Sequence, residues 1–243
     1  MFRVSGDPDT VSLGRRLVAA LSYKSDESLS FLLASLLVLL FVVYPFLTLD
    51  GVGRYVTDAF FSLVLVSGTL AVERRRWRQF ALVLAGITLV TRWTTYVRPE
   101  RELLFANVFL GTVFLAFASV VILGRVFAAG RVTRHRIEGA VAVYLLIGLV
   151  FGLVYALIAM FEPNAFDIGP VPTMSDPRGL YDFYMARFSY FSFITLTTVG
   201  YGDVTPLASA AKQMAVLEGL IGQLYPAILL ARLVSMEIAG RGE

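Results

Sequence analysis

The sequence has 243 residues, of which 57% are hydrophobic and only 16% are charged. An ordinary soluble domain has about 25% charged residues, so this composition argues against a soluble globular protein and against a disordered chain. The absence of cysteine excludes disulfides and zinc–thiolate sites. The net charge of +3 is compatible with nucleic-acid binding. However, the basic residues form no contiguous stripe, so we expect no nucleic-acid partner.

Six apolar runs are long enough to cross a membrane as helices, since about 20 residues span the hydrocarbon. In chain order they are residues 29–49, 55–72, 77–97, 103–127, 137–161 and 208–238. Residues 162–182 are rich in Pro, Gly and Asp and predict an exposed loop. The apolar run that follows, 183–196, would form a helix only about 21 Å long. We therefore expect a re-entrant helix that does not cross the membrane.

Basic residues gather on one side of the predicted membrane. Of the 21 Lys and Arg residues, those on this side are Arg3, Arg15, Arg16, Lys24, Arg74, Arg75, Arg76, Arg78, Arg125, Arg131, Arg134, Arg136, Arg232 and Arg241. The positive-inside rule places this side, and with it both termini, in the cytoplasm, which agrees with an even number of spans. We expect an all-α, multi-pass protein of the cell membrane. Its predicted parts are a cytoplasmic segment (1–28), a four-helix membrane domain (29–127), a cytoplasmic linker (128–136) and a final two-helix domain (137–243).

The segment TTVGYGD, residues 197–203, directly follows the predicted re-entrant helix. Glycine reaches positive φ without steric cost, so Gly200 and Gly202 allow the backbone to alternate in hand. Successive carbonyl groups then point the same way and can replace the hydration shell of K⁺, which carboxylates would bind too tightly. Val199 and Tyr201 can point away from this row of oxygens, and we expect them to brace the strand from behind.

The order of these elements resembles that of the potassium-channel family, in which a pore helix precedes the selectivity filter. The resemblance covers about residues 137–238, the two-helix pore domain, and includes Pro206 after the filter. It implies that K⁺ is bound at the carbonyls of residues 198–202, with the hydroxyl of Thr198 as a further oxygen. A ring of carbonyls needs four chains, and this sequence has one such segment, so we expect a homotetramer. A non-selective monovalent cation channel with the same architecture is the alternative.

The resemblance also assigns residues that support the filter. Thr197 and Asp203 flank it, and aromatic residues at the positions of Tyr190 and Phe191 form a cuff around it in the family. Family members often have an acid four residues before Thr198, paired with the aspartate after the filter. Ile194 stands there in this sequence, so we expect that pairing to be absent.

The last predicted helix is about 46 Å long, longer than the hydrocarbon. Gly219, Gly222 and Pro226 lie near its middle and can loosen it. The resemblance implies that Gly222 is a gating hinge, whereas for Gly219 we prefer close helix packing to a hinge role. The family alignment places a mostly apolar stripe on the pore axis, which can gate by dewetting. It consists of Gln223, Pro226, Leu230 and Val234.

Glu218 is an ionisable residue inside the same helix, and such residues mark functional sites in membranes. We expect it to brace the pore helix or a neighbouring subunit through Thr195 or Thr197. A carboxyl group that is simply protonated is the alternative.

The four front helices lack the charges of a voltage sensor. Residues 103–124 of the fourth run contain no charged residue, although moving one charge across 100 mV is worth only about 2.3 kcal/mol and several are needed. We therefore expect weak voltage dependence or none. Asp58 and Arg92 lie at similar depth in the second and third runs. They can form an intramembrane pair or reach the membrane surface independently.

Other functional classes lack their signatures in this sequence. A transporter or membrane enzyme would show intramembrane polar clusters, broken helices in repeated halves or a catalytic constellation. We accordingly expect no enzymatic activity, no cofactor and no further ligand beyond K⁺ as permeant ion. The expected partners are three further copies of the chain and membrane lipids. A non-conducting scaffold subunit would have no reason to retain the glycines of residues 197–203.

Overall fold

The computed structural model describes residues 28–43, 51–128, 133–171 and 177–241, and these are almost entirely helical. The predicted segment 1–28 lies outside them except for its last residue, and so does part of the predicted linker 128–136. The elements are the helix Ser28–Val43 with its π-helical end η1 (Leu39–Val43), α2 (Gly51–Leu70), α3 (Arg75–Thr94), α4 (Arg101–Val126), α5 (Arg134–Phe161), β1 (Phe166–Asp167), α6 (Pro177–Leu196), β2 (Thr205–Pro206) and α7 (Ser209–Arg241).

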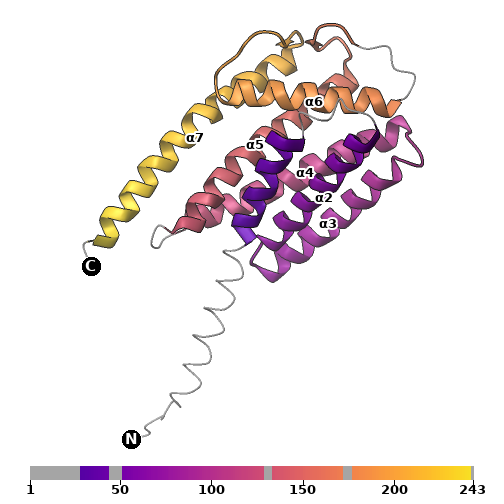
Figure 1. Ribbon diagram of the computed structural model, residues 1–243. Coiled ribbons are helices and arrows are strands. Elements are labelled where there is room, and N and C mark those ends of the chain that lie inside the picture. The colour runs from indigo at the N-terminus through magenta and orange to yellow at the C-terminus, as the bar shows by residue number, and fades with distance from the viewer. Residues whose placement is uncertain (1–27, 44–50, 129–132, 172–176, 242–243) are drawn as a thin grey trace, which may run out of the picture.

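Helices α2 to α5 lie side by side in one bundle, and α6 runs across one end of it (Figure 1). Helix α7 starts at the same end and runs back alongside α5, on the outside of the bundle (Figure 1). The most extensive packing joins α4 to α5, and α5 also packs against α6 and α7. Helix α5 therefore connects the front helices to the two elements that flank residues 197–203, which we call the filter segment after the prediction above.

Three helices among the described residues are long and apolar enough to span a membrane, namely α4, α5 and α7 up to Met236. The sequence predicts six spans. The helix Ser28–Val43 is too short by this criterion, while α2 contains Arg54 and Asp58 and α3 contains Arg92. Charged residues lower the hydropathy of α2 and α3, so composition alone does not mark them as spans.

The helix before the filter is longer than predicted. It begins at Pro177 and not at residue 183, so its first turns occupy the end of the predicted loop 162–182. Proline is favoured at the first position of a helix because its φ is preset and its missing N–H is not needed there. Pro177, which the sequence indicated as part of a loop, is therefore the first residue of α6.

A short antiparallel ribbon joins the loop before α6 to the residues that follow the filter segment. Strand β1 pairs with β2 in the register Phe166 to Pro206 and Asp167 to Thr205. Behind it, the ring of Phe166 lies 5.6 Å from Tyr155 of α5 and 4.7 Å from Phe188 of α6. This aromatic core fixes the end of the filter segment against the pore helix.

Candidate ion-conduction site

The backbone of the filter segment alternates in hand as the glycine spacing predicts. Gly200 has φ 56° and Gly202 has φ 78°, and Thr198 also has a positive φ, 60°. Among the described residues Thr198 is the only non-glycine residue with positive φ. A β-branched residue in this region is a genuine outlier, and such outliers cluster at functional sites. Three alternate residues therefore share the left-handed conformation, one more than glycine spacing alone indicates.

The end of α6 holds the amide groups of this segment. The N–H groups of residues 197–200 donate to carbonyl oxygens of residues 193–195, with N to O distances of 2.9 to 3.0 Å. The carbonyl groups of residues 198–202 accept no hydrogen bond from any other described residue. The donors thus face the pore helix, and the acceptors are left for another partner, as in a row of oxygen ligands for a cation.

The aromatic residues predicted to surround the filter have different environments. Phe191 is buried, with its ring 4.9 Å from that of Tyr155. The hydroxyl of Tyr190 donates to Oδ1 of Asp203 at 3.2 Å. Position 194 carries isoleucine, so in this chain Asp203 is held by the hydroxyl of Tyr190 and not by a residue at that position.

The side chains of Val199 and Tyr201 do not brace the strand within one chain. They are 52% and 74% exposed. The sequence predicts that both pack behind the strand, and the described part of this chain provides no surface that buries them.

Glu218 contacts the pore helix through residues that the sequence did not single out. Its side chain is fully buried, at 0% exposure. The hydroxyl of Tyr155 donates to Oε2 at 2.5 Å, and the hydroxyl of Ser192 donates to Oε1. Within one chain the prediction of Thr195 or Thr197 as partner is wrong, because Glu218 meets α6 at Ser192, one turn before the end of that helix. The hydroxyl of Thr197 donates to the carbonyl of Phe193 instead, at 2.7 Å.

Tyr155 and Ser192 are thus site residues that sequence reasoning missed. Each is a polar residue inside an apolar helix, which is the one signal that could have found them. Ser192 also lies 2.6 Å from the carbonyl oxygen of Gly148 in α5. The hydroxyl therefore ties the pore helix to both neighbouring helices.

Gly219 and Gly222 of α7 have opposite environments. A Cβ at Gly222 would lie 1.8 Å from the carbonyl oxygen of Leu196, whereas a Cβ at Gly219 would meet nothing within 4 Å in this chain. Close packing was predicted for Gly219, and within one chain it belongs to Gly222. Glu218 and Gly222 lie four residues apart, so both are on the side of α7 that faces α6. A Cβ at Gly222 would therefore meet the backbone of α6, whereas one at Gly219 would not.

Helix α7 is continuous through Pro226. Proline has no N–H to donate to the carbonyl four residues earlier, which is that of Gly222. The predicted axis-facing residues Pro226, Leu230 and Val234 are exposed in the single chain. The missing hydrogen bond and the glycine therefore coincide on one turn of α7.

A family model and two relatives are similar to this chain. A family model described as ion channel matches residues 143–238, which include most of α5, the filter segment and most of α7. Protein LctB of Bacillus caldotenax is 30% identical over 129 residues, covering 50% of this chain and 92% of that protein. Protein LctB of Geobacillus stearothermophilus is 31% identical over 86 residues, covering 35% of this chain and 60% of that protein. No solved structure matches.

Proposed function

Because this chain belongs to the ion channel family, we propose that four copies form a potassium-selective channel that conducts K⁺ passively across the cell membrane. The observation that carries the proposal is the filter backbone, with positive φ at residues 198, 200 and 202. This alternation would align the carbonyl oxygens of residues 198–202, which accept no hydrogen bond from another described residue.

The chemistry of such oxygens suits a monovalent cation. Carbonyl dipoles replace the hydration shell of the ion and are neutral, so they bind K⁺ without holding it too tightly to leave. The sites would comprise the carbonyls of residues 198–202, with the Thr198 hydroxyl at the inner end. A non-selective monovalent cation channel with the same pore is the alternative, and selectivity separates the two.

The exposed surfaces of one chain support a tetramer. One chain supplies one row of carbonyls, and a ring requires several chains around an axis. Val199 and Tyr201 are exposed next to the filter. Of the apolar stretch of α7 only 17% is buried, against 61% for that of α5. Neighbouring copies would cover these side chains and α7 in the assembled channel.

The topology of the proposed subunit has six spans with both termini in the cytoplasm. Helices α4, α5 and α7 meet the criteria of length and composition. The helix Ser28–Val43, α2 and α3 would complete the four-helix domain, since they pack beside α4 in the same bundle. Charged residues of α4 occur only in its first and last turns, so this domain would give weak voltage dependence or none.

The gate of the proposed channel lies on α7. The turn from Gly222 to Pro226 would act as the hinge, because it lacks one intrahelical hydrogen bond. Leu230 and Val234 would close the inner pore by excluding water. Replacing Leu230 with aspartate should then raise the open probability in bilayer recordings, and an unchanged open probability would contradict this gate.

The decisive experiment measures reversal potentials of the reconstituted protein in K⁺/Na⁺ gradients. With opposite K⁺ and Na⁺ gradients and the same total cation concentration on both sides, a selective channel reverses near the K⁺ equilibrium potential, whereas a non-selective one reverses near zero.

Alanine variants at two glycines with similar φ provide a matched pair. Gly202 has φ 78° and Gly169, in the loop before α6, has φ 74°. Alanine at either position costs about 1–2 kcal/mol in backbone strain. Selectivity should be lost only in Gly202→Ala, and equal selectivity of the two variants would refute the proposed filter.

A further inference from the structure

Three buried charges meet outside the filter, where α2, α3 and α6 come together. Asp58 of α2 is 2% exposed, Arg92 of α3 is 6% exposed and Arg178 of α6 is 2% exposed. Arg92 donates from Nε to Oδ1 of Asp58 at 2.7 Å. Arg178 donates from Nη2 to the other carboxylate oxygen, Oδ2. One aspartate of the front helices therefore binds both its expected neighbour and the first turn of the pore helix.

Aromatic rings fix the two guanidinium groups in place. The guanidinium carbon of Arg178 lies 3.9 Å from the ring centre of Tyr96, whose hydroxyl donates to Oδ2 of Asp58 at 2.7 Å. Arg92 lies 4.0 Å above the ring of Phe61. A planar guanidinium group combines such stacking with a directed bond to a carboxylate, which a lysine does not. The contact thus specifies arginine at position 178.

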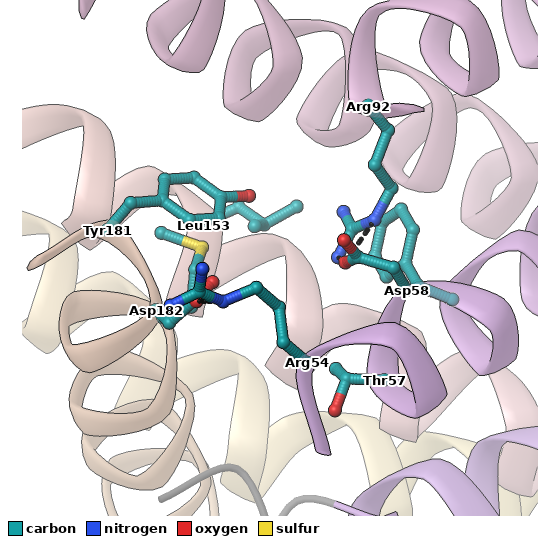
Figure 2. A pocket seen from close by; sticks show the side chains of 9 residues that line it. Arg54, Thr57, Asp58, Arg92, Leu153, Tyr181 and Asp182 are labelled. Atoms are coloured by element: carbon teal, nitrogen blue, oxygen red, sulfur yellow. Dashed lines mark hydrogen bonds and ion pairs between the residues drawn. The ribbon is translucent and has the colours of Figure 1, made fainter. Parts of the chain in front are cut away.

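A second ion pair joins the same two helices one turn further along α6. Arg54 of α2 lies with Nε 2.5 Å from Oδ2 of Asp182. Figure 2 shows this pair on one side of a small cavity and the contact between Arg92 and Asp58 on the other. The cavity holds about 20 Å³, which is room for about one water molecule. The cavity is too small for an organic ligand. We therefore assign the charged residues around it to holding α2 and α6 together and not to binding a ligand.

Helix α6 carries this attachment to the filter. It is continuous from Pro177 to Leu196, and the filter amides bind its last carbonyl groups. We propose that α2 positions the pore helix through the contacts of Asp58 with Arg178 and of Arg54 with Asp182, so that the front helices set the conducting state of the filter. This inference rests on the proposed function, because it needs a conducting filter.

Two methionine variants of the full-length channel separate this positioning role from general stability. Arg92→Met and Arg178→Met each remove one of the two cations on Asp58, leave the other, and retain an apolar side chain of similar length. Only Arg178 belongs to α6. We expect both variants to lower the unfolding temperature. Only Arg178→Met should change the K⁺/Na⁺ permeability ratio or the open dwell time of the filter, by several-fold, and Arg178→Lys should restore part of the change.

The outcomes distinguish the positioning role from the proposed function. Equal changes in both methionine variants, or no change in either, would overturn the positioning role. If Arg178→Met fails to assemble, Asp182→Asn tests the second ion pair with the same recordings, and wild-type filter behaviour there would overturn it. A wild-type protein without selective K⁺ current refutes the proposed function itself, whatever the variants do.

Discussion

Gly222→Ala is expected to disrupt the contact between α7 and the end of the pore helix. The added Cβ would lie 1.8 Å from the carbonyl oxygen of Leu196 and 2.7 Å from its carbonyl carbon. Real Cβ contacts are essentially never shorter than 3.0 Å, so the two backbones must separate by about 1.2 Å, the difference between 1.8 and 3.0 Å.

The carbonyl group of Leu196 cannot move alone to relieve this clash. The hydroxyl of Tyr144 donates to it at 3.2 Å, and the filter segment begins at the next residue. Overpacking against fixed neighbours costs up to about 3 kcal/mol, and replacing a helical glycine with alanine returns about 1 kcal/mol. We expect a net loss of about 2 kcal/mol in the free energy of unfolding per subunit, together with altered K⁺ flux.

Gly219→Ala is the matched control, because its Cβ meets nothing within 4 Å in this chain. It should leave stability unchanged or raise it by up to about 1 kcal/mol. Thermal unfolding in detergent and K⁺ flux into liposomes measure both variants. If Gly222→Ala unfolds at the wild-type temperature, the close approach of α7 to Leu196 is refuted. A change in gating alone would then leave only the hinge role of Gly222.

Three further predictions concern side chains around the pore helix. Glu218→Gln should conduct like the wild type, because the amide can hydrogen-bond both hydroxyl partners, those of Tyr155 and Ser192. Glu218→Leu leaves a buried hydroxyl unpaired, so thermal unfolding should show a free energy of unfolding lower by about 1–3 kcal/mol. Tyr190→Phe removes the hydrogen bond to Asp203, so current should decline faster during sustained opening, and an unchanged time course contradicts this role. Burial raises the pKa of Asp182, which lies outside the spanning helices, to about 6 against the opposing effect of Arg54. The folded state then binds a proton more readily than the unfolded state, so stability should rise as the pH falls from about 6 toward the ordinary value of 3.8. Asp182→Asn should abolish this dependence, and an unaltered pH profile would show that another group causes it.

Local sequence patterns predicted the parts of the site that depend on residues close to one another in the sequence. The glycine spacing indicated the alternating backbone at Gly200 and Gly202, since handedness depends on the residue itself. The equal depth of Asp58 and Arg92 allowed a pair, and the structure brings the two together. The start of α6 at Pro177 was missed, because proline marks a turn and a helix start with the same residue.

The sequence by itself determined the apolar helices α4, α5 and α7 and the left-handed backbone at Gly200 and Gly202, because each follows from residues within a few positions of one another. Only the tertiary structure decided which residues those elements meet. Arg178 binds Asp58 across 120 positions of sequence, and Glu218 finds Ser192 and Tyr155. Gly222, and not Gly219, meets the backbone of Leu196. Such contacts depend on how α2, α6 and α7 cross, and the crossing is set by the packing of whole helix faces.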